Sequence, residues 1–154
     1  MEDSVQTRKI KGDLISNKYV NVDGKNISIA NDLLKISSLG LLDINDENLK
    51  QNEKADEVWA TISNNNLERQ SNIIIGDYKT RTLLIDSIVN FVVKYDIKGI
   101  NINFYNIDNV QAFNRFILEL SPRLREIGVS TNVIITDKLN ETDYVGIVDF
   151  ITEK

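Results

Sequence analysis

The sequence predicts an α/β domain in which helices flank a parallel sheet and a β-hairpin comes first. Short apolar segments at 58–63, 99–104 and 132–136 have the length and composition of buried strands. Two longer segments, 79–95 and 109–127, place their apolar residues on one face at helical spacing. Strands that alternate with amphipathic helices pair in parallel through right-handed crossovers. The order of these segments therefore predicts a parallel sheet with helices packed on it.

The amino-terminal third is predicted to be less regular. Residues 1–12 are polar and are expected to form a flexible tail. Residues 19–29 alternate apolar and polar side chains about Asp23-Gly24, which is typical of a β-hairpin. The apolar stretch 32–42 fits either a short helix or a strand. Residues 43–56, rich in Asn, Asp, Glu and Lys, are expected to form a surface connection.

The carboxyl-terminal half contains recognisable boundary signals. Gly128 is placed to end the second helix in a left-handed conformation. Pro122 lies within that helix and is expected to kink it, or to restart it with Ser121 as a cap. Residues 144–148 lead into a last strand at 150–151.

Composition excludes several classes of function. The 154 residues show no linker or internal repeat, so residues 13–154 are predicted to form one domain. The net charge of −5 argues against nucleic-acid binding, and the basic run 8–11 is expected to lie in the solvated tail. The absence of cysteine excludes disulfides, and the absence of histidine removes the commonest general base and transition-metal ligand. No metal site and no cofactor are expected. No apolar run reaches the ~20 residues that span a membrane. Residues 1–6 lack the features of a secretory signal, so the protein is either cytoplasmic or its signal lies outside this chain.

The most informative segment lies at 98–105 and reads Lys-Gly-Ile-Asn-Ile-Asn-Phe-Tyr. It resembles the signature strand of the family 18 glycoside hydrolases, which include chitinases and the glucosaminidases of spore cortex and cell wall. That family's pattern runs Asp-Gly-x-Asp-x-Asp-x-Glu. The glycine and the apolar positions fit this pattern. The four acidic positions are occupied instead by Lys98, Asn101, Asn103 and Tyr105.

The resemblance extends over about residues 55–154. Residues 58–64 resemble the family's preceding strand, 81–95 the helix before the signature strand, and 113–124 the helix after it. Residues 143–147 resemble the approach to the strand that carries the family's Met-x-Tyr-Asp motif. That motif would fall on Val148, Asp149, Phe150 and Ile151, so its Met, Tyr and Asp are replaced. Because a complete (β/α)8 barrel takes ~250 residues, the resemblance implies a partial or shortened TIM-barrel-like parallel sheet.

The resemblance also implies a substrate-assisted hydrolysis whose acids are missing here. In family members the final Glu protonates the glycosidic oxygen, and the Asp two residues earlier orients the substrate's 2-acetamido group. The amide of Asn103 can still hydrogen-bond that group, but it carries no charge to stabilise a developing cation. Tyrosine has an ordinary pKa of about 10, which makes Tyr105 a poor proton donor to an ether oxygen at neutral pH. No catalytic residue is therefore expected.

Any ligand site is expected at the carboxyl ends of the strands, where parallel β/α folds place their sites. The candidate ligand-binding residues there are Asn64, Asn103, Tyr105 and Asn106. A competing interpretation is that Asn101, Asn103 and Tyr105 only fill a disused interior with paired polar groups. Trp59 sits at the start of its strand and is expected to pack in the core rather than to stack on a sugar. Asp108 is expected to be a turn residue or a helix cap rather than a relocated acid.

Three functions are compatible with the sequence. The first is a catalytically inactive domain that binds N-acetylglucosamine-containing glycans of peptidoglycan or chitin weakly. The second is a structural or interaction module, and the third is an active glycosidase. About five parallel strands are too few to close an eight-stranded barrel, which leaves unpaired edges and an exposed apolar interior. A homodimer, a partner chain or the amino-terminal segment is expected to cover them.

Overall fold

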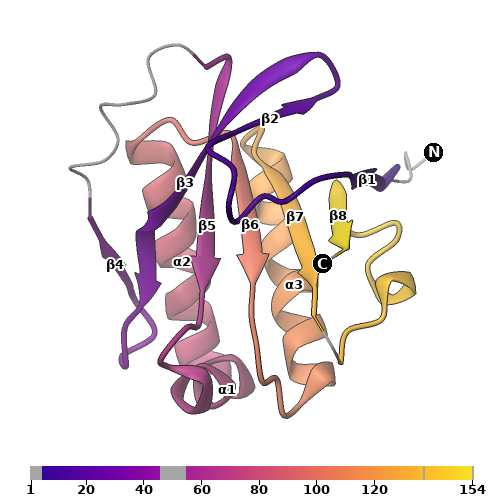
Figure 1. Ribbon diagram of the computed structural model, residues 1–154. Helices are drawn as coiled ribbons and strands as arrows, with labels where there is room; N and C mark the ends of the chain where they lie inside the picture. Colours follow the sequence, from indigo (N-terminus) through magenta and orange to yellow (C-terminus); the bar gives the residue numbers. More distant parts are fainter. Residues whose placement is uncertain (1–4, 46–54, 137, 154) are drawn as a thin grey trace.

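The computed structural model describes residues 5–45, 55–136 and 138–153, without the side chains of Asp32 and Leu33, and these residues form one curled sheet with three helices (Figure 1). The strands are β1 (Arg8–Ile10), β2 (Tyr19–Val22), β3 (Lys25–Ile36), β4 (Leu42–Ile44), β5 (Glu57–Ser63), β6 (Gly99–Asn103), β7 (Ser130–Ile135) and β8 (Phe150–Glu153). Parallel pairs join them in the order β3, β5, β6, β7, β8 and β1. β2 and β4 both pair with β3 in the antiparallel sense. The predicted α/β class is therefore confirmed, with a mostly parallel sheet curled into a nearly closed barrel.

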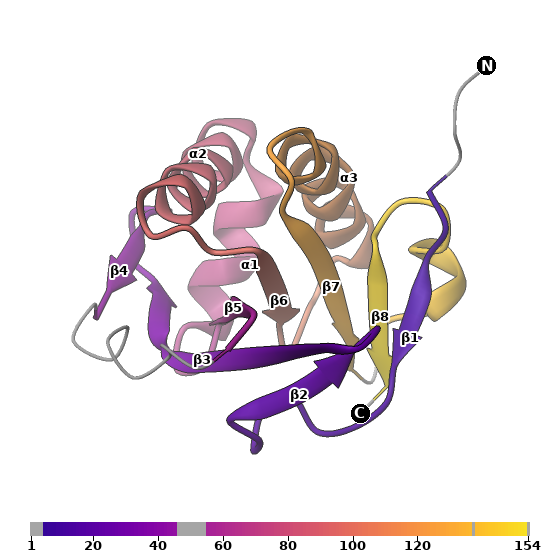
Figure 2. The same cartoon turned by 90° about the horizontal axis from the view of Figure 1, so that it is seen from above.

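The helices lie together on the outer face of the sheet, as the view from above shows (Figure 2). They are α1 (Glu68–Gly76), α2 (Tyr78–Lys94) and α3 (Val110–Glu126). α2 and α3 match the two predicted helices, and each begins at a side-chain cap, Asp77 for α2 and Asn109 for α3. The sequence did not predict α1, because this helix is short and its apolar residue Ile73 is exposed, which blurs the amphipathic pattern.

α3 passes through Pro122 as one uninterrupted helix, so the expected restart at this residue is wrong. The Pro122 ring is exposed and removes the donor that would bond the Leu118 carbonyl. Because Leu118 also faces solvent, water can take that bond. The hydroxyl of Ser121 does not cap a helix but donates to the Ile147 carbonyl at 3.0 Å. Gly128 follows the helix with φ at +78°, which confirms the predicted left-handed end.

The predicted hairpin is confirmed as β2 and β3, with the turn at Asp23 and Gly24. Both turn residues have positive φ, 53° for Asp23 and 82° for Gly24. The ambiguous stretch 32–42 is strand rather than helix in its first half, because β3 continues to Ile36 before the chain turns back as β4. Most of the predicted surface connection, residues 46–54, lies outside the described residues.

The flexible tail expected over residues 1–12 is wrong for residues 8–10, which form β1 and pair with β8. Neighbouring strand residues point to opposite sides, and each basic side chain of β1 meets an acidic group on its own side. Arg8 forms an ion pair with Asp23, and Lys9 forms one with Glu141 at 2.9 Å. The hydrogen bond and charge of Glu141 raise the pKa of the Lys9 ammonium. Residues 8–10 thus belong to the sheet, and their basic side chains pair at its surface.

Two hydrophobic clusters lie on the two faces of the sheet. The outer cluster fills the space between the sheet and the helices. The inner cluster consists of Ile10, Leu14, Val22, Ile27, Ile29, Trp59 and Phe150. All of these residues except Trp59 and Phe150 belong to β1, the segment after it, and the hairpin. The amino-terminal segment therefore covers the interior, which is one of the three expected solutions. Trp59 is buried against Phe150, with ring centroids 5.5 Å apart, which confirms its predicted place in the core.

The described residues between β7 and β8 form loops and the single-turn helix η2 (Glu141–Asp143) instead of an α-helix. Tyr144 anchors this connection, since it is buried and its hydroxyl donates to the Asn114 side chain at 2.6 Å. Burial raises the pKa of the Tyr144 phenol. Among the helices of the described chain, none has both the length and the apolar character needed to cross a membrane.

Candidate functional site

The signature-like strand β6 lies in the middle of the sheet, and all five of its residues are buried. Its alternating side chains separate into two sets. Ile100 and Ile102 join the outer cluster under the helices. Gly99 lies against Trp59 of the inner cluster, and Asn101 and Asn103 share its face. The predicted inner position of these two asparagines is therefore confirmed.

A continuous row of hydrogen-bonded side chains crosses the inner face from β5 to β8. The Asn101 amide donates to the Thr61 hydroxyl at 3.2 Å. The Asn132 amide donates to the Asn101 side-chain oxygen at 2.9 Å, and the Thr152 hydroxyl donates to the Asn132 oxygen at 3.0 Å. None of the four residues of this inner row is more than 3% exposed. Asn101 is thus paired within the interior, as the competing interpretation predicts for this residue.

Asn103 lies two residues beyond Asn101, at the carboxyl end of β6, and its hydrogen bonding differs from that of Asn101. It stands opposite Ser63 on β5 and is 4% exposed. Its side-chain oxygen is buried and accepts no hydrogen bond from any described residue. A buried acceptor without a donor is energetically unfavourable, so this oxygen is suited to accept an N–H or O–H group.

Asn64 joins the carboxyl ends of two strands. Its amide donates to the Tyr105 carbonyl at 2.8 Å and to the Ser71 hydroxyl at 2.9 Å. Its side-chain oxygen accepts from the Tyr105 backbone N–H at 2.8 Å. Asn64 is buried, and these bonds tie the end of β5 to the end of β6 and to α1. Its side chain is therefore engaged within the protein.

Tyr105 and Asn106 border a hollow of about 580 Å³ beyond the ends of β6 and β7. The rest of its lining consists of Ile107, Ile135, Thr136, Lys138 and Leu139. Asn106 has a positive φ of 52°, and its carbonyl accepts from the Asn72 side chain at 2.9 Å. The structure thus brings two of the four candidate residues to one open hollow and buries the other two. That any of them binds a ligand stays a prediction.

The remaining candidate positions lie away from this hollow. Lys98 precedes β6 at the opposite end of the strand and forms an ion pair with Asp96 at 3.0 Å. Asp108 exchanges bonds with Asn72, donating its backbone N–H at 3.0 Å and accepting the amide at 3.3 Å. Asp108 is therefore a turn residue, as predicted.

From Trp59 onwards, the inner-face positions of β5 to β8 contain no ionisable side chain, and the structure describes all of them. They are Trp59, Thr61, Ser63, Gly99, Asn101, Asn103, Ser130, Asn132, Ile134, Phe150 and Thr152. No group of three acidic side chains in the described residues could hold a metal ion. The amides and hydroxyls at these positions can hydrogen-bond a neutral molecule.

The sequence matches no protein-family model and no curated protein, whereas its structure matches several solved structures. The spore cortex-lytic enzyme SleL of Bacillus cereus superposes with a TM-score of 0.68 at 21% identity, over 81% of this chain and 33% of that enzyme. The ydhD protein of Bacillus subtilis, a candidate sporulation-specific glycosylase, gives 0.74 at 15% identity, over 90% of this chain and 56% of that protein. A class V chitinase from Pseudomonas fluorescens gives 0.67 at 18% identity, over 79% and 44%.

These similarities concern the fold. The chain has the architecture of part of the TIM barrel found in chitinases and spore cortex-lytic enzymes of glycoside hydrolase family 18. It spans about a third to just over half of the length of those structures. At these identities the shared fold does not by itself establish a shared activity.

Proposed function

We propose that this chain is a catalytically inactive relative of the family 18 glycoside hydrolases that binds N-acetylglucosamine-containing glycans weakly. The observation that supports inactivity is the uncharged inner face of β5 to β8. Protonation of a glycosidic oxygen by a positioned acid contributes ~10²–10⁴-fold to the rate of hydrolysis. The inner row Thr61–Asn101–Asn132–Thr152 offers amides and hydroxyls in the place of such an acid.

The hollow beside Tyr105 and Asn106 supports the binding part of the proposal. It combines an aromatic ring, an amide, the Thr136 hydroxyl and the Lys138 ammonium with apolar side chains. A pyranose has an apolar face that suits an aromatic ring and hydroxyls that suit the polar groups. Asn103 lies two positions before Tyr105, and its side-chain oxygen, which accepts no hydrogen bond from the described residues, can accept the N–H of an acetamido group that reaches the inner face.

Two measurements on the full chain test the proposal. Labelled chitooligosaccharides should show no hydrolysis above a buffer control. Chemical-shift mapping with chitotetraose should show millimolar binding, with shifts at Tyr105, Asn106 and Thr136. Tyr105→Ala should weaken binding about two- to tenfold, because a lost aromatic contact is worth ~0.5–1.5 kcal/mol.

Tyr78→Ala is the matched control, because Tyr78 is an exposed tyrosine on the outer, helical side of the sheet. This substitution should leave binding unchanged. Turnover that Tyr105→Phe abolishes would overturn the proposed inactivity. The absence of shifts at millimolar chitotetraose would overturn the proposed binding.

A second candidate function is an interaction module, and one surface feature supports it. Leu41, Ile44 and Leu83 are each more than 40% exposed and border a hollow of about 310 Å³ between β4 and α2. Exposed apolar groups gathered around a hollow are typical of protein interfaces. If a homodimer forms here, sedimentation should show concentration-dependent association that Leu83→Asp abolishes and Leu118→Asp, an exposed position on α3, does not. Sedimentation as a monomer at several hundred micromolar would exclude this homodimer.

A further inference from the structure

We propose that residues 7–18, the amino-terminal strap, open as a unit while the rest of the domain stays folded, and that this opening controls access to the inner face. In Figure 1 the strap runs from β1 across the front of β7 and β6 before it turns into β2. What enters when the strap opens rests on the proposed function, whereas the opening itself does not.

The strap is attached by few buried groups. Within the strap, which the structure describes throughout, Ile10 and Leu14 are the buried side chains, and the others are partly or fully exposed. In the described sheet, β1 stands at the end of the strand order and pairs with β8 alone. β6, by contrast, is buried at every position and pairs on both sides. Segments with few buried contacts and one-sided pairing open at lower free energy than central strands.

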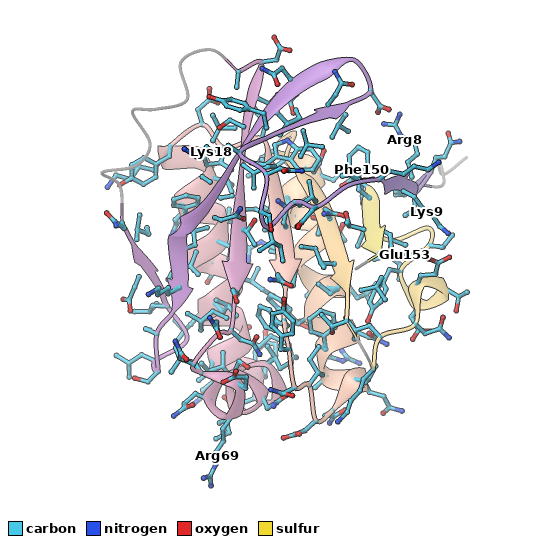
Figure 3. All side chains as sticks on the ribbon, viewed as in Figure 1. Arg8, Lys9, Lys18, Arg69, Phe150 and Glu153 are labelled. Carbon is cyan, nitrogen blue, oxygen red and sulfur yellow. The ribbon has the colours of Figure 1, made fainter. Side chains whose placement is uncertain are left out.

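Apart from Ile10, the side chains of β1 form ion pairs at the surface. Arg8 pairs with Asp23 and lies over the Phe150 ring, while Lys9 reaches Glu141 at 2.9 Å and Glu153 at 3.7 Å (Figure 3). The Arg8 and Lys9 side chains are both more than half exposed. Exposed ion pairs contribute little to stability and are screened by salt. They can therefore break without disturbing the sheet.

Two hydrogen-bonding side chains hold the ends of the strap. At its start, the Thr7 hydroxyl donates to the Val148 carbonyl at 2.6 Å and accepts from the Gly146 N–H at 2.9 Å. Towards its other end, the Asn31 amide donates to the Leu14 and Ile15 carbonyls at 3.1 and 2.7 Å. Asn31 lies at the irregularity of β3 between Ala30 and Leu34, outside the regular ladder. The Asn31 side chain therefore holds the strap against β3 through these two hydrogen bonds.

A hollow of about 370 Å³ lies beneath the strap. Strap residues 12–15 line one side, and Ile134, Thr152 and Glu153 of the sheet line the other. Thr152 is the end of the inner row, and Ile134 is the inner-face neighbour of Asn103 in the register of β6 and β7. Opening of the strap would convert this hollow into a groove that leads to the row and to the unpaired Asn103 oxygen.

Single-cysteine reporters test this opening in the full chain, which contains no other cysteine. Asn103→Cys places a thiol on the inner face, and Ile102→Cys places one on the outer face of the same strand under the helices. Thiol labelling under native conditions should be at least about tenfold faster at position 103 than at position 102, because position 102 becomes accessible only on global unfolding. Adding Asn31→Ala should accelerate labelling at 103 at least about threefold and leave 102 unchanged. Asn90→Ala, an exposed asparagine of α2, is the matched control for Asn31→Ala and should change neither rate.

The outcomes separate this proposal from the proposed function. Equal labelling rates at positions 102 and 103, or no acceleration at 103 by Asn31→Ala, would overturn the proposed opening of the strap. Amide exchange of β1 in the unsubstituted chain gives an independent check, since β1 amides should exchange faster than β6 amides. Chitotetraose should bind more tightly to the Asn31→Ala chain, and equal affinity for both chains would overturn the control of access. Position 103 could still be labelled through strap opening while neither chain binds chitotetraose. That result would overturn the proposed glycan binding and the role of the strap in it. The proposed opening of the strap would still stand.

Discussion

The α-carbon of Gly99 lies so close to the indole ring of Trp59 that a methyl group added there would come within 2.2 Å of the ring. Glycine is needed at this position for its size, because its φ is not in the left-handed region. The first residue of the signature-like strand thus makes room for the largest side chain of the inner cluster.

Gly99→Ala should therefore destabilise the domain. Overpacking a filled core typically lowers the free energy of unfolding by about 1–3 kcal/mol. Urea unfolding followed by tryptophan fluorescence measures the change. Gly76→Ala is the control, because a methyl group at the end of α1 meets no heavy atom within 4 Å. Equal unfolding midpoints for the two variants would contradict the close approach to Trp59.

Asn64→Ala should be destabilising because it leaves both backbone groups of Tyr105 without their Asn64 partners. Buried groups left unsatisfied cost about 1–3 kcal/mol in the free energy of unfolding. Asn65→Ala changes the exposed neighbouring asparagine and should be within ~0.5 kcal/mol of the unsubstituted chain. A small effect at both positions would mean that the hydrogen bonds between Asn64 and the Tyr105 backbone do not stabilise the domain.

Asn101→Asp should make stability depend on pH. Burial raises the pKa of a carboxyl group above the ~3.9 of an unfolded chain, so the folded state keeps a proton that the unfolded state loses. The free energy of unfolding, relative to the unsubstituted chain, should then fall as pH rises above about 4, by ~1.4 kcal/mol for each unit of pKa elevation. Below that pH the protonated acid can donate to Thr61 as the amide does. Asn65→Asp, at an exposed position, should show no such decrease.

Glu57 should stabilise the domain above pH ~4.5 and lose this contribution in acid. Its partial burial raises the carboxyl pKa, but hydrogen bonds from Lys25 and the Trp59 indole, with the charge of Lys25, outweigh this and lower it. A lowered folded-state pKa means that stability is present above the unfolded pKa and is lost as pH falls. Glu57→Gln should lower the free energy of unfolding at pH 7 by at most ~1 kcal/mol, and the difference should shrink below pH ~4. Lys25→Gln should weaken the pH dependence of the free energy of unfolding over the same range. If the stability difference between the Glu57→Gln variant and the unsubstituted chain grew as pH fell, this assignment would be contradicted.

The sequence predicted the two long helices, the hairpin and the central strands, because each repeats its pattern over several turns or pleats. The same alternation placed Asn101 and Asn103 on the inner face. β1 was missed because three residues are too few to show a period. α1 was missed because an exposed isoleucine interrupts its pattern.

The partners of the inner asparagines were harder to predict than their orientation. Alternation within one strand does not give the register between strands, so it could not pair Asn101 with Thr61 and Asn132. A signal was nevertheless present, because Thr61 and Asn132 are polar residues within strands predicted to be buried, and buried polar groups require partners. The covering of the interior by the strap depends on contacts between the two ends of the chain, which local patterns do not contain.

The hydrogen bond from the Thr7 hydroxyl to the Val148 carbonyl joins residues 141 positions apart. Chains are synthesised from the amino terminus at ~5–20 residues per second, so β1 waits many seconds before its partner β8 leaves the ribosome. During that time the inner apolar cluster lacks Phe150 and cannot close. Because contacts between distant residues also slow folding, we expect the inner cluster to close late, only after β8 has been synthesised.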